Sequence, residues 1–392
     1  MNIAIYGGSF NPPHLGHREA AASVIQYLSP DRFLIIPDRV PPHKEMEEGS
    51  PSPEERLYLC QLNFGDLAGI EISDLELRRT GKSYTYDTIC ELEQLYPSDR
   101  LFLVLGTDMF LSFEEWYHFE YLLEHCGLAV LARDFDDRIL LEETADRFAS
   151  DYGAEILILP HTPLPMSSAE IRNLLKLRNG ADYLKSEVYA EIIRKRLYAS
   201  VPELSWLREQ AYAMLHESRI AHVAGCESEA VQLAKFWGED PENAAESGIL
   251  HDITKRLSYE EQLQLCKKYD IILDSAERRL PKLLHARTGA AVARDLFGIS
   301  DIVFDAIRWH TTGKPDMTLL EKILYIADYI EPTRDFPGVE GIRDLAYKDL
   351  DRAILLGLQM TVEEVRETGN EPYYDTINAL EWYQRTISER SS

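Results

Sequence analysis

The sequence predicts two units of different fold class: an α/β unit with a doubly wound parallel sheet over residues 1–199, and an all-α unit over residues 204–392. In the first half, near-continuous apolar runs alternate with amphipathic stretches, which is typical of strands buried on both faces and joined by helices. From about Glu187 the strand signal disappears, and Val201-Pro202 interrupts the helical pattern. A chain of 392 residues is long enough for two or three such units.

The elements of the first unit follow in order. Its predicted strands are the apolar runs at 2–6, 32–36, 101–105, 127–132 and 155–159. Residues 56–64 and 87–96 have the amphipathic pattern of helices, and residues 187–200 are predicted to close the unit as a further helix. From Leu204 onward the pattern is that of helices joined by polar loops.

The composition argues against two classes of partner. The formal net charge of −26 disfavours sequence-independent binding to nucleic acid, because that affinity comes from basic contacts to phosphate. No apolar run reaches about 18 residues, and the first residues lack the basic start and apolar stretch of a signal peptide, so no membrane partner is expected. Five scattered cysteines without a CxxC pair indicate reduced thiols, and we expect a cytoplasmic protein. The oligomeric state stays open, a homo-oligomer included.

The first predicted strand runs into GGSFNPPHLGH, residues 7–17. Gly7 and Gly8 allow a sharp turn and a close approach to a ligand, and the start of the following helix suits phosphate. The stretch is neither a P-loop, since no GK[ST] follows, nor a GxGxxG fingerprint. His14 and His17 are three residues apart and share one face of that helix. Together these features favour a nucleotide site over an ordinary strand-to-helix junction.

The helical half carries histidines and acids in positions suited to a metal ion. Asp328 is the acid within the apolar stretch ILYIADYI, and a buried carboxylate needs a partner such as a metal. His251 and Asp252 end another small apolar run, so both can converge on an ion beyond that helix end, with His222 and Asp328 supplied by other helices. Mixed nitrogen and oxygen ligands suit Fe, Mn, Co or Zn.

Two further histidines extend this set. His285 and His310 are placed to complete a second metal site beside the first, with Asp252 as the bridge. A pair of ions would supply a bridging hydroxide and clamp a phosphate, which favours hydrolysis of a phosphoester or phosphoanhydride. Each of these histidines alone is more often an ordinary core or surface residue, so the interpretation depends on the whole set.

Three basic residues are candidates to meet the substrate of this second site. Lys255 follows Asp252 by three residues and is predicted to act in catalysis by neutralising a substrate phosphate. Arg219 and Arg334 are further candidates, although a solvated surface arginine is the ordinary expectation for each.

The N-terminal motifs resemble a known family. GGSFNPPHLGH is similar to the signature of nucleotidyltransferases with an HxGH motif. Further motifs, in the same order, resemble the bacterial nicotinate mononucleotide adenylyltransferases: PPHK (41–44), SYTYDT (83–88), LGTDM (105–109), WY (116–117) and SSAEIR (167–172). The resemblance covers residues 1–199. It implies a Rossmann-like nucleotidyltransferase that transfers AMP from ATP to nicotinate mononucleotide and releases pyrophosphate, with Mg²⁺ on the phosphates.

The resemblance also implies roles for single residues in phosphate transfer. His14 and His17 would act in catalysis by stabilising charge on the α-phosphate, while Lys44 and Arg172 would hold the triphosphate. The remaining ATP contacts implied by the family are Gly7, Gly8, Ser9, Phe10, Gly106, Asp108, Arg133, Ser167 and Ser168. Arg133 opens ArgAspPhe, where the family often has Arg-Pro-Gly.

For the second substrate, the resemblance implies that Trp116 stacks on the pyridine ring while Thr85 and Tyr117 hydrogen-bond the nicotinate carboxylate. Two alternatives stay open. Trp116 and Tyr117 could be an ordinary packing pair, and Thr85 could cap the helix that follows it. The preference for an acid over an amide rests on the family alone.

The order His222, His251-Asp252, Asp328 resembles the HD superfamily of metal-dependent phosphohydrolases. The runs ILHDITK, LLHA, WHTTG and IADYIEPTR are similar to the bacterial HD-type bis(5′-nucleosyl)-tetraphosphatases, over residues 204 to about 380. This resemblance implies iron as the metal and the symmetrical hydrolysis of a dinucleoside polyphosphate, diadenosine tetraphosphate, to ADP. Two other interpretations remain: hydrolysis of another nucleotide, and a nucleotide-sensing module that regulates the adenylyltransferase. The complete ligand set favours hydrolysis.

Overall fold

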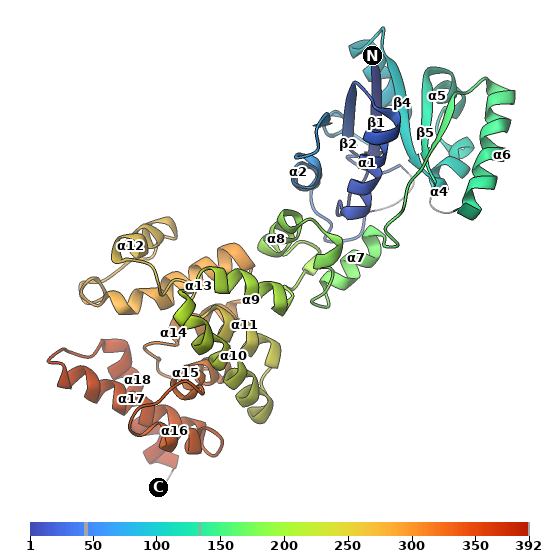
Figure 1. The fold of residues 1–392 in the computed structure, drawn as a ribbon. Coiled ribbons are helices and arrows are strands. Elements are labelled where there is room, and N and C mark those ends of the chain that lie inside the picture. The colour runs from blue at the N-terminus through green and yellow to red at the C-terminus, as the bar shows by residue number, and fades with distance from the viewer. Residues whose placement is uncertain (43–45, 133–134, 391–392) are drawn as a thin grey trace. The chain divides into compact units, whose positions relative to one another are not determined.

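The computed structural model describes residues 1–42, 46–132 and 135–390, and only the backbone at residues 135–138 and 279. The chain divides into two compact units, Met1–Val201 and Pro202–Ser392 (Figure 1). The first unit is α/β, and the described residues of the second form helices joined by loops, with no strand, so the predicted fold classes are confirmed.

A six-stranded parallel sheet forms the centre of the first unit, in the order β3-β2-β1-β4-β5-β6. The strands are β1 (Asn2–Gly8), β2 (Arg32–Pro37), β3 (Ile70–Ile72), β4 (Arg100–Gly106), β5 (Cys126–Leu131) and β6 (Ile156–Leu159). The order in which strands are added to the sheet reverses between β1 and β4: β2 and β3 lie on one side of β1, and β4, β5 and β6 lie on the other. In open α/β sheets, ligands bind beyond the carboxyl ends of the strands at such a switch point.

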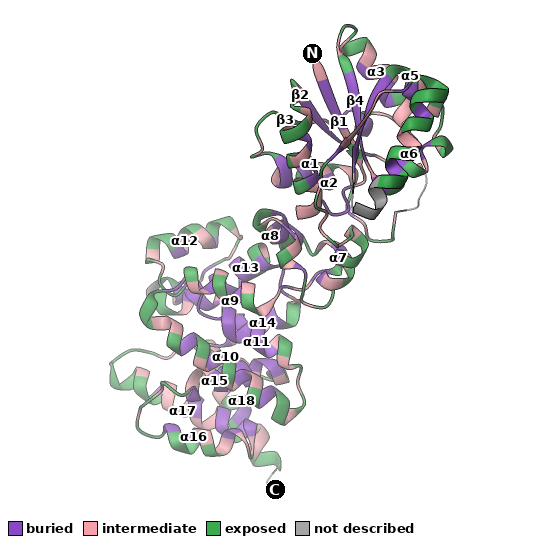
Figure 2. Ribbon diagram, turned by 45° about the vertical axis from the view of Figure 1, so that its right-hand side comes forward, coloured by how far each residue is buried: buried purple, intermediate pink, exposed green. Residues whose placement is uncertain are grey.

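Helices cover both faces of this sheet. On one face, α1 (Leu15–Leu28) and α2 (Pro53–Phe64) pack against strand residues such as Ala4 and Ile35. On the other face, Ile5 and Leu103 meet α3 (Thr85–Leu95), α4 (Thr107–Leu111), α5 (Phe119–His125) and α6 (Phe135–Tyr152). In β1, β2, β4 and β5, alternate residues enter different cores, so these central strands are buried on both faces (Figure 2).

Two short helices complete the first unit, α7 (Ser168–Leu175) and α8 (Ser186–Lys195). The predicted helix over 187–200 ends earlier than expected. Arg196 adopts a left-handed conformation with φ of 53°, which stops α8, and a single 3₁₀ turn at Leu197–Ala199 follows.

The second unit is a helical bundle. Its α-helices are α9 (Leu204–Ala213), α10 (Glu217–Trp237), α11 (Pro241–Leu250), α12 (Tyr259–Lys268), α13 (Leu284–Phe297), α14 (Asp301–Trp309), α15 (Leu319–Ile330), α16 (Val339–Ala346), α17 (Leu350–Glu367) and α18 (Tyr374–Arg390). Helix α15 packs against α10, α11, α14 and α17 and is buried around most of its circumference. Its mostly hydrophobic sequence matches this central position.

All five cysteines lie within the described residues, where they are free thiols. Within the same residues, none of the helices combines the length and the apolar character needed to cross a bilayer.

Candidate active sites

The first candidate site is a cavity of about 340 Å³ at the carboxyl ends of β1, β2 and β4. Among its lining residues are Gly7, Gly8, Ser9, Asp38, Glu76, Thr85, Trp116 and Tyr117. The structure therefore brings the predicted glycine turn and the three predicted pyridine contacts to one cavity. This cavity lies at the switch point of the sheet, where the fold provides a ligand site.

The side chains suited to a pyridine ring are partly open to the cavity. Trp116 packs one side against Phe113, with ring centroids 5.0 Å apart, and also lines the cavity, so packing and lining are not exclusive. Tyr117 is exposed and its ring lies 4.9 Å from that of Tyr84. Thr85 is the first residue of α3, whose N-cap is Tyr84, so the structure does not support a capping role for Thr85.

The histidine motif occupies the start of α1. His14 is the N-cap residue, and its backbone N–H donates to His17 Nδ1 at 3.2 Å, with the two rings 3.8 Å apart. Because Nδ1 of His17 accepts this bond, the proton of the neutral His17 ring is on Nε2. Burial lowers the pKa of His14 to about 4, so this imidazole is neutral at pH 7. The ring of Phe10 is buried against Phe64.

Helix α7 is joined to the histidine loop by two hydrogen bonds. Ser168 Oγ donates to the carbonyl of Pro12 at 3.0 Å, and Arg172 Nη1 donates to the carbonyl of Asn11 at 2.7 Å. Arg172 also pairs with Glu47, and Ser167 caps α7. These contacts bring Arg172 and Ser168 beside the loop that carries His14, although they are far apart in sequence.

The other predicted nucleotide contacts lie as follows. Gly106 ends β4 and caps α4, and Asp108 is exposed in the first turn of α4. Met109, rather than Asp108, lines the cavity. Lys44 and Arg133 lie outside the described residues.

Arg56 was not among the predicted site residues, yet it binds two segments that line the cavity. Its side chain is 1% exposed and donates to the carbonyls of Ser9 at 2.6 Å and Asp38 at 2.7 Å. These bonds tie the glycine turn to the end of β2. A charged residue in the buried helical stripe of Arg56, Leu59 and Cys60 was the available signal.

The second candidate site collects residues from separate helices of the second unit. His222 comes from α10, His251 is the C-cap of α11 and is followed by Asp252, His285 comes from α13, His310 is the C-cap of α14, and Asp328 comes from α15. All six predicted metal ligands thus meet in two groups of three.

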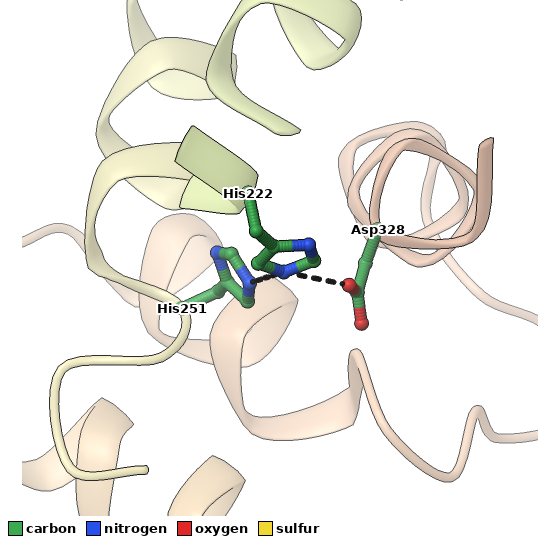
Figure 3. A group of neighbouring side chains, drawn as sticks. All are labelled: His222, His251 and Asp328. Carbon is green, nitrogen blue, oxygen red and sulfur yellow. Dashed lines mark hydrogen bonds and ion pairs between the residues drawn. The ribbon is translucent and has the colours of Figure 1, made fainter. Parts of the chain in front are cut away.

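The first group is formed by His222, His251 and Asp328 (Figure 3). His222 Nε2 lies 3.1 Å from Asp328 Oδ1 and 3.3 Å from His251 Nε2. His251 Nε2 is in turn 3.4 Å from Asp252 Oδ2.

The second group is formed by Asp252, His285 and His310. His285 Nε2 lies 3.2 Å from Asp252 Oδ1 and 3.2 Å from His310 Nε2. The Asp252 side chain is fully buried, and its Oδ1 has no hydrogen bond. One oxygen of Asp252 thus faces each group, which is the arrangement a bridging ligand requires.

Hydrogen bonds fix which nitrogen of each ring faces the centre. Nδ1 of His251, His285 and His310 lies 2.8, 2.6 and 2.6 Å from a backbone carbonyl three residues earlier. Because a carbonyl oxygen only accepts, the proton of each neutral ring is on Nδ1, and Nε2 presents the lone pair. Burial lowers the pKa of His285 to about 4, which keeps that ring neutral.

These residues fit a metal ion. The Nε2 atoms of His285 and His310 are acceptors that face each other across 3.2 Å, and a cation between them removes the conflict. Ligand atoms bound to one ion at about 2.1 Å lie about 3.0–3.4 Å from each other. The contacts of 3.1 to 3.3 Å in the two groups fall in this range, while His310 Nε2 and Asp252 Oδ1 are 3.7 Å apart. Such a fit does not depend on which transition metal binds.

Three cations neutralise the acids of this centre. Arg219 Nε donates to Asp252 Oδ2 at 2.7 Å, and Arg334 Nη2 donates to Asp328 Oδ1 at 2.5 Å. Lys255 Nζ lies 3.0 Å from His285 Nε2 and 3.6 Å from Asp252 Oδ1. The expectation of solvated arginines at 219 and 334 is therefore wrong, because each pairs with a site carboxylate.

Asp328 is also less buried than its apolar helix predicts. Its side chain is 18% exposed, and α15 ends two residues later, at Ile330. Glu331, which the sequence analysis missed, is the fully buried acid here and lies 3.0 Å from His222 Nδ1. An acid at the very end of an apolar helix, directly before Pro332, was the available signal.

Comparisons with known proteins agree with this division. Residues 5–174 match the cytidylyltransferase-like family, and residues 219–333 match the HD domain family. A Fusobacterium nucleatum protein named "probable nicotinate-nucleotide adenylyltransferase" is 35% identical over 196 residues, 50% of this chain and 98% of the relative.

Two relatives carry the name "bis(5′-nucleosyl)-tetraphosphatase, symmetrical". The Bacillus subtilis protein is 37% identical over 180 residues, 45% of this chain and 96% of the relative. The Halalkalibacterium halodurans protein is 41% identical over 168 residues, 42% of this chain and 87% of the relative. The chain therefore joins a cytidylyltransferase-like domain of the nicotinate-nucleotide adenylyltransferase family to an HD domain of the family that contains these symmetrical tetraphosphatases.

Proposed function

We propose that the chain is a bifunctional enzyme. The first unit transfers AMP from ATP to nicotinate mononucleotide, giving nicotinate adenine dinucleotide and pyrophosphate, with Mg²⁺ on the triphosphate. The second unit hydrolyses diadenosine tetraphosphate with one water to two molecules of ADP. The names of the relatives support these substrates.

In the first unit, the cavity supports the binding of a pyridine nucleotide. Trp116 offers a ring face, and the Thr85 and Tyr117 hydroxyls suit a carboxylate. The glycine turn lets a phosphate approach the backbone, and His14 and His17 lie on the helix that follows it. We assign the two histidines to the α-phosphate, where hydrogen-bond donors stabilise the charge that develops during transfer.

In the second unit, one observation carries the proposal: both oxygens of Asp252 face histidine pairs, one pair on each side. The two groups would each hold a divalent ion, which would supply an activated water and polarise the attacked phosphate. Arg219, Lys255 and Arg334 lie 29%, 39% and 33% exposed at this centre, where they can meet further phosphates of the substrate. Iron is the metal we propose.

Separate loss of the two activities tests this proposal. His17→Ala should lower AMP transfer on the order of 10²- to 10³-fold and leave hydrolysis unchanged, because one charge-stabilising donor is lost. His251→Ala should abolish hydrolysis and leave AMP transfer unchanged. Loss of both activities in either variant would contradict two independent sites.

Product analysis separates the remaining interpretations of the second unit. Incubation with a nucleotide panel should give ADP as the sole product from diadenosine tetraphosphate. ATP plus AMP would indicate asymmetric cleavage, and faster turnover of another nucleotide would replace the proposed substrate. Binding of metal and diadenosine tetraphosphate without turnover would favour a sensing module.

A further inference from the structure

His222 differs from the other histidines of the metal centre in how its Nδ1 is held. His251 and His310 cap helix ends and His285 begins a helix, so each finds a backbone carbonyl on its own segment. His222 lies within α10, where helical hydrogen bonds already occupy the backbone carbonyls. Its Nδ1 instead meets the carboxylate of Glu331 at 3.0 Å, from 109 residues further along the chain.

Glu331 is itself held in place. Its side chain is fully buried at the end of α15, and it accepts hydrogen bonds from the Thr333 backbone N–H at 2.7 Å and the Thr333 hydroxyl at 2.5 Å. Both oxygens of Glu331 thus accept hydrogen bonds, which is the role of a carboxylate.

A glycine on α10 makes room for this carboxylate. Gly225 follows His222 by three residues, and a Cβ there would lie 2.5 Å from Glu331 Oε2 and 3.2 Å from Pro332 Cδ. Glycine is unfavourable in the interior of a helix, so its presence within α10 needs a reason. The close approach of Glu331 provides that reason.

We propose that Glu331 is a positioning residue for the metal centre. It keeps the proton of His222 on Nδ1, orients the ring, and makes Nε2 a stronger ligand, as carboxylates behind metal-bound histidines do. Gly225 is the second residue of this arrangement, because a side chain at this position would collide with the Glu331 carboxylate behind His222. This inference rests on the proposed metal centre and adds a residue outside the six ligands.

Cobalt binding by the full chain tests the role of Glu331. Titration of metal-free protein with Co²⁺, followed by the visible absorption of the bound ion, gives an affinity without any activity assay. Glu331→Gln keeps the size of the side chain but removes its charge, and should weaken Co²⁺ binding about 10- to 100-fold, the usual effect of losing such a partner. Gly225→Ala should weaken binding in the same direction, because it displaces the carboxylate.

A double-mutant cycle distinguishes positioning from a general structural effect. If Glu331 acts through His222, adding Glu331→Gln to His222→Ala should change Co²⁺ affinity by less than about twofold. An equal loss in both backgrounds would assign Glu331 a structural role and overturn the inference.

Glu321→Gln is the matched control. Glu321 is also a buried acid of α15, 1% exposed, but it pairs with Lys314 at the opposite end of the helix. We expect this variant to bind Co²⁺ like the wild type. If Glu331→Gln also binds like the wild type, the inference fails while the metal centre stands. If the wild type binds no Co²⁺, both the centre and the inference fail.

Discussion

The two histidine clusters of this protein present opposite groups to their ligands. In the first unit, His17 accepts a hydrogen bond at Nδ1, so its neutral ring offers an Nε2–H donor. In the second unit, His251, His285 and His310 donate from Nδ1 to backbone carbonyls and offer Nε2 lone pairs. A donor suits the oxygen of a phosphate and a lone pair suits a cation.

The difference teaches that closeness of histidines does not by itself make a metal site. His14 and His17 have rings 3.8 Å apart and belong to none of the possible metal-ligand groups among the described residues. The second cluster differs by its carboxylates and by the fixed tautomers of its rings. The partner of Nδ1 is thus as informative as the distance between rings.

The largest expected effect comes from removing the carboxylate between the two groups. Asp252→Asn keeps the shape of the side chain but removes the charge that faces both histidine pairs, so hydrolysis should fall by more than about 1,000-fold. AMP transfer should not change. Asp344→Asn, at an exposed position on α16, is the control and should retain both activities. Residual hydrolysis within tenfold of the wild type would contradict a metal bridge at Asp252.

Removing the metal should lower the stability of the second unit and leave that of the first unit unchanged. Metal that binds only the folded state stabilises it by about 4 kcal/mol when its free concentration is 1,000 times its Kd. Adding a chelator should therefore speed amide hydrogen exchange in α10, α11 and α15 and leave the strands of the first unit unchanged. Equal acceleration in both units would mean that the clusters do not differ as proposed.

A smaller effect is expected from pH in the first unit. The pKa of His14 is about 4 in the folded protein and about 6.5 when unfolded, so the unfolded state binds more protons between these values. The resulting stability is fully present above pH 6.5 and is lost as pH falls toward 4, by up to about 3 kcal/mol.

Exchange of His14 for a group that does not titrate checks this assignment. His14→Gln should flatten the fall in stability of the first unit between pH 6.5 and 4.5, measured by denaturant unfolding. An unchanged slope would show that the burial of His14 does not govern the acid sensitivity.

Local patterns predicted most elements of the fold. The five long apolar runs correspond to β1, β2, β4, β5 and β6. The strand β3 escaped because it has only three residues, none of them fully buried, and its pairing with β2 is visible only in three dimensions. The end of α8 escaped as well, because Arg196 takes a left-handed conformation that its residue type does not require.

The sites divide in a similar way. The six predicted ligands meet in two groups, and the sequence signals were the His-Asp pair at the end of one apolar run and the acid within another. Arg56 and Glu331 were missed despite a local signal, because the partner that each contacts, Ser9 or His222, is distant in the chain. The contacts of Arg219 and Arg334 were missed for the same reason: sequence shows an exposed charge but not the acid opposite it.

The two helix-capping histidines have a consequence for how metal leaves the centre. His251 and His310 end α11 and α14, and each Nδ1–H satisfies a carbonyl of the last helical turn. Fraying of that turn would remove the bond that orients the ligand. Escape of an ion from the proposed centre would then accompany local melting of a helix end, so its lifetime there would depend on how often these two helix ends fray.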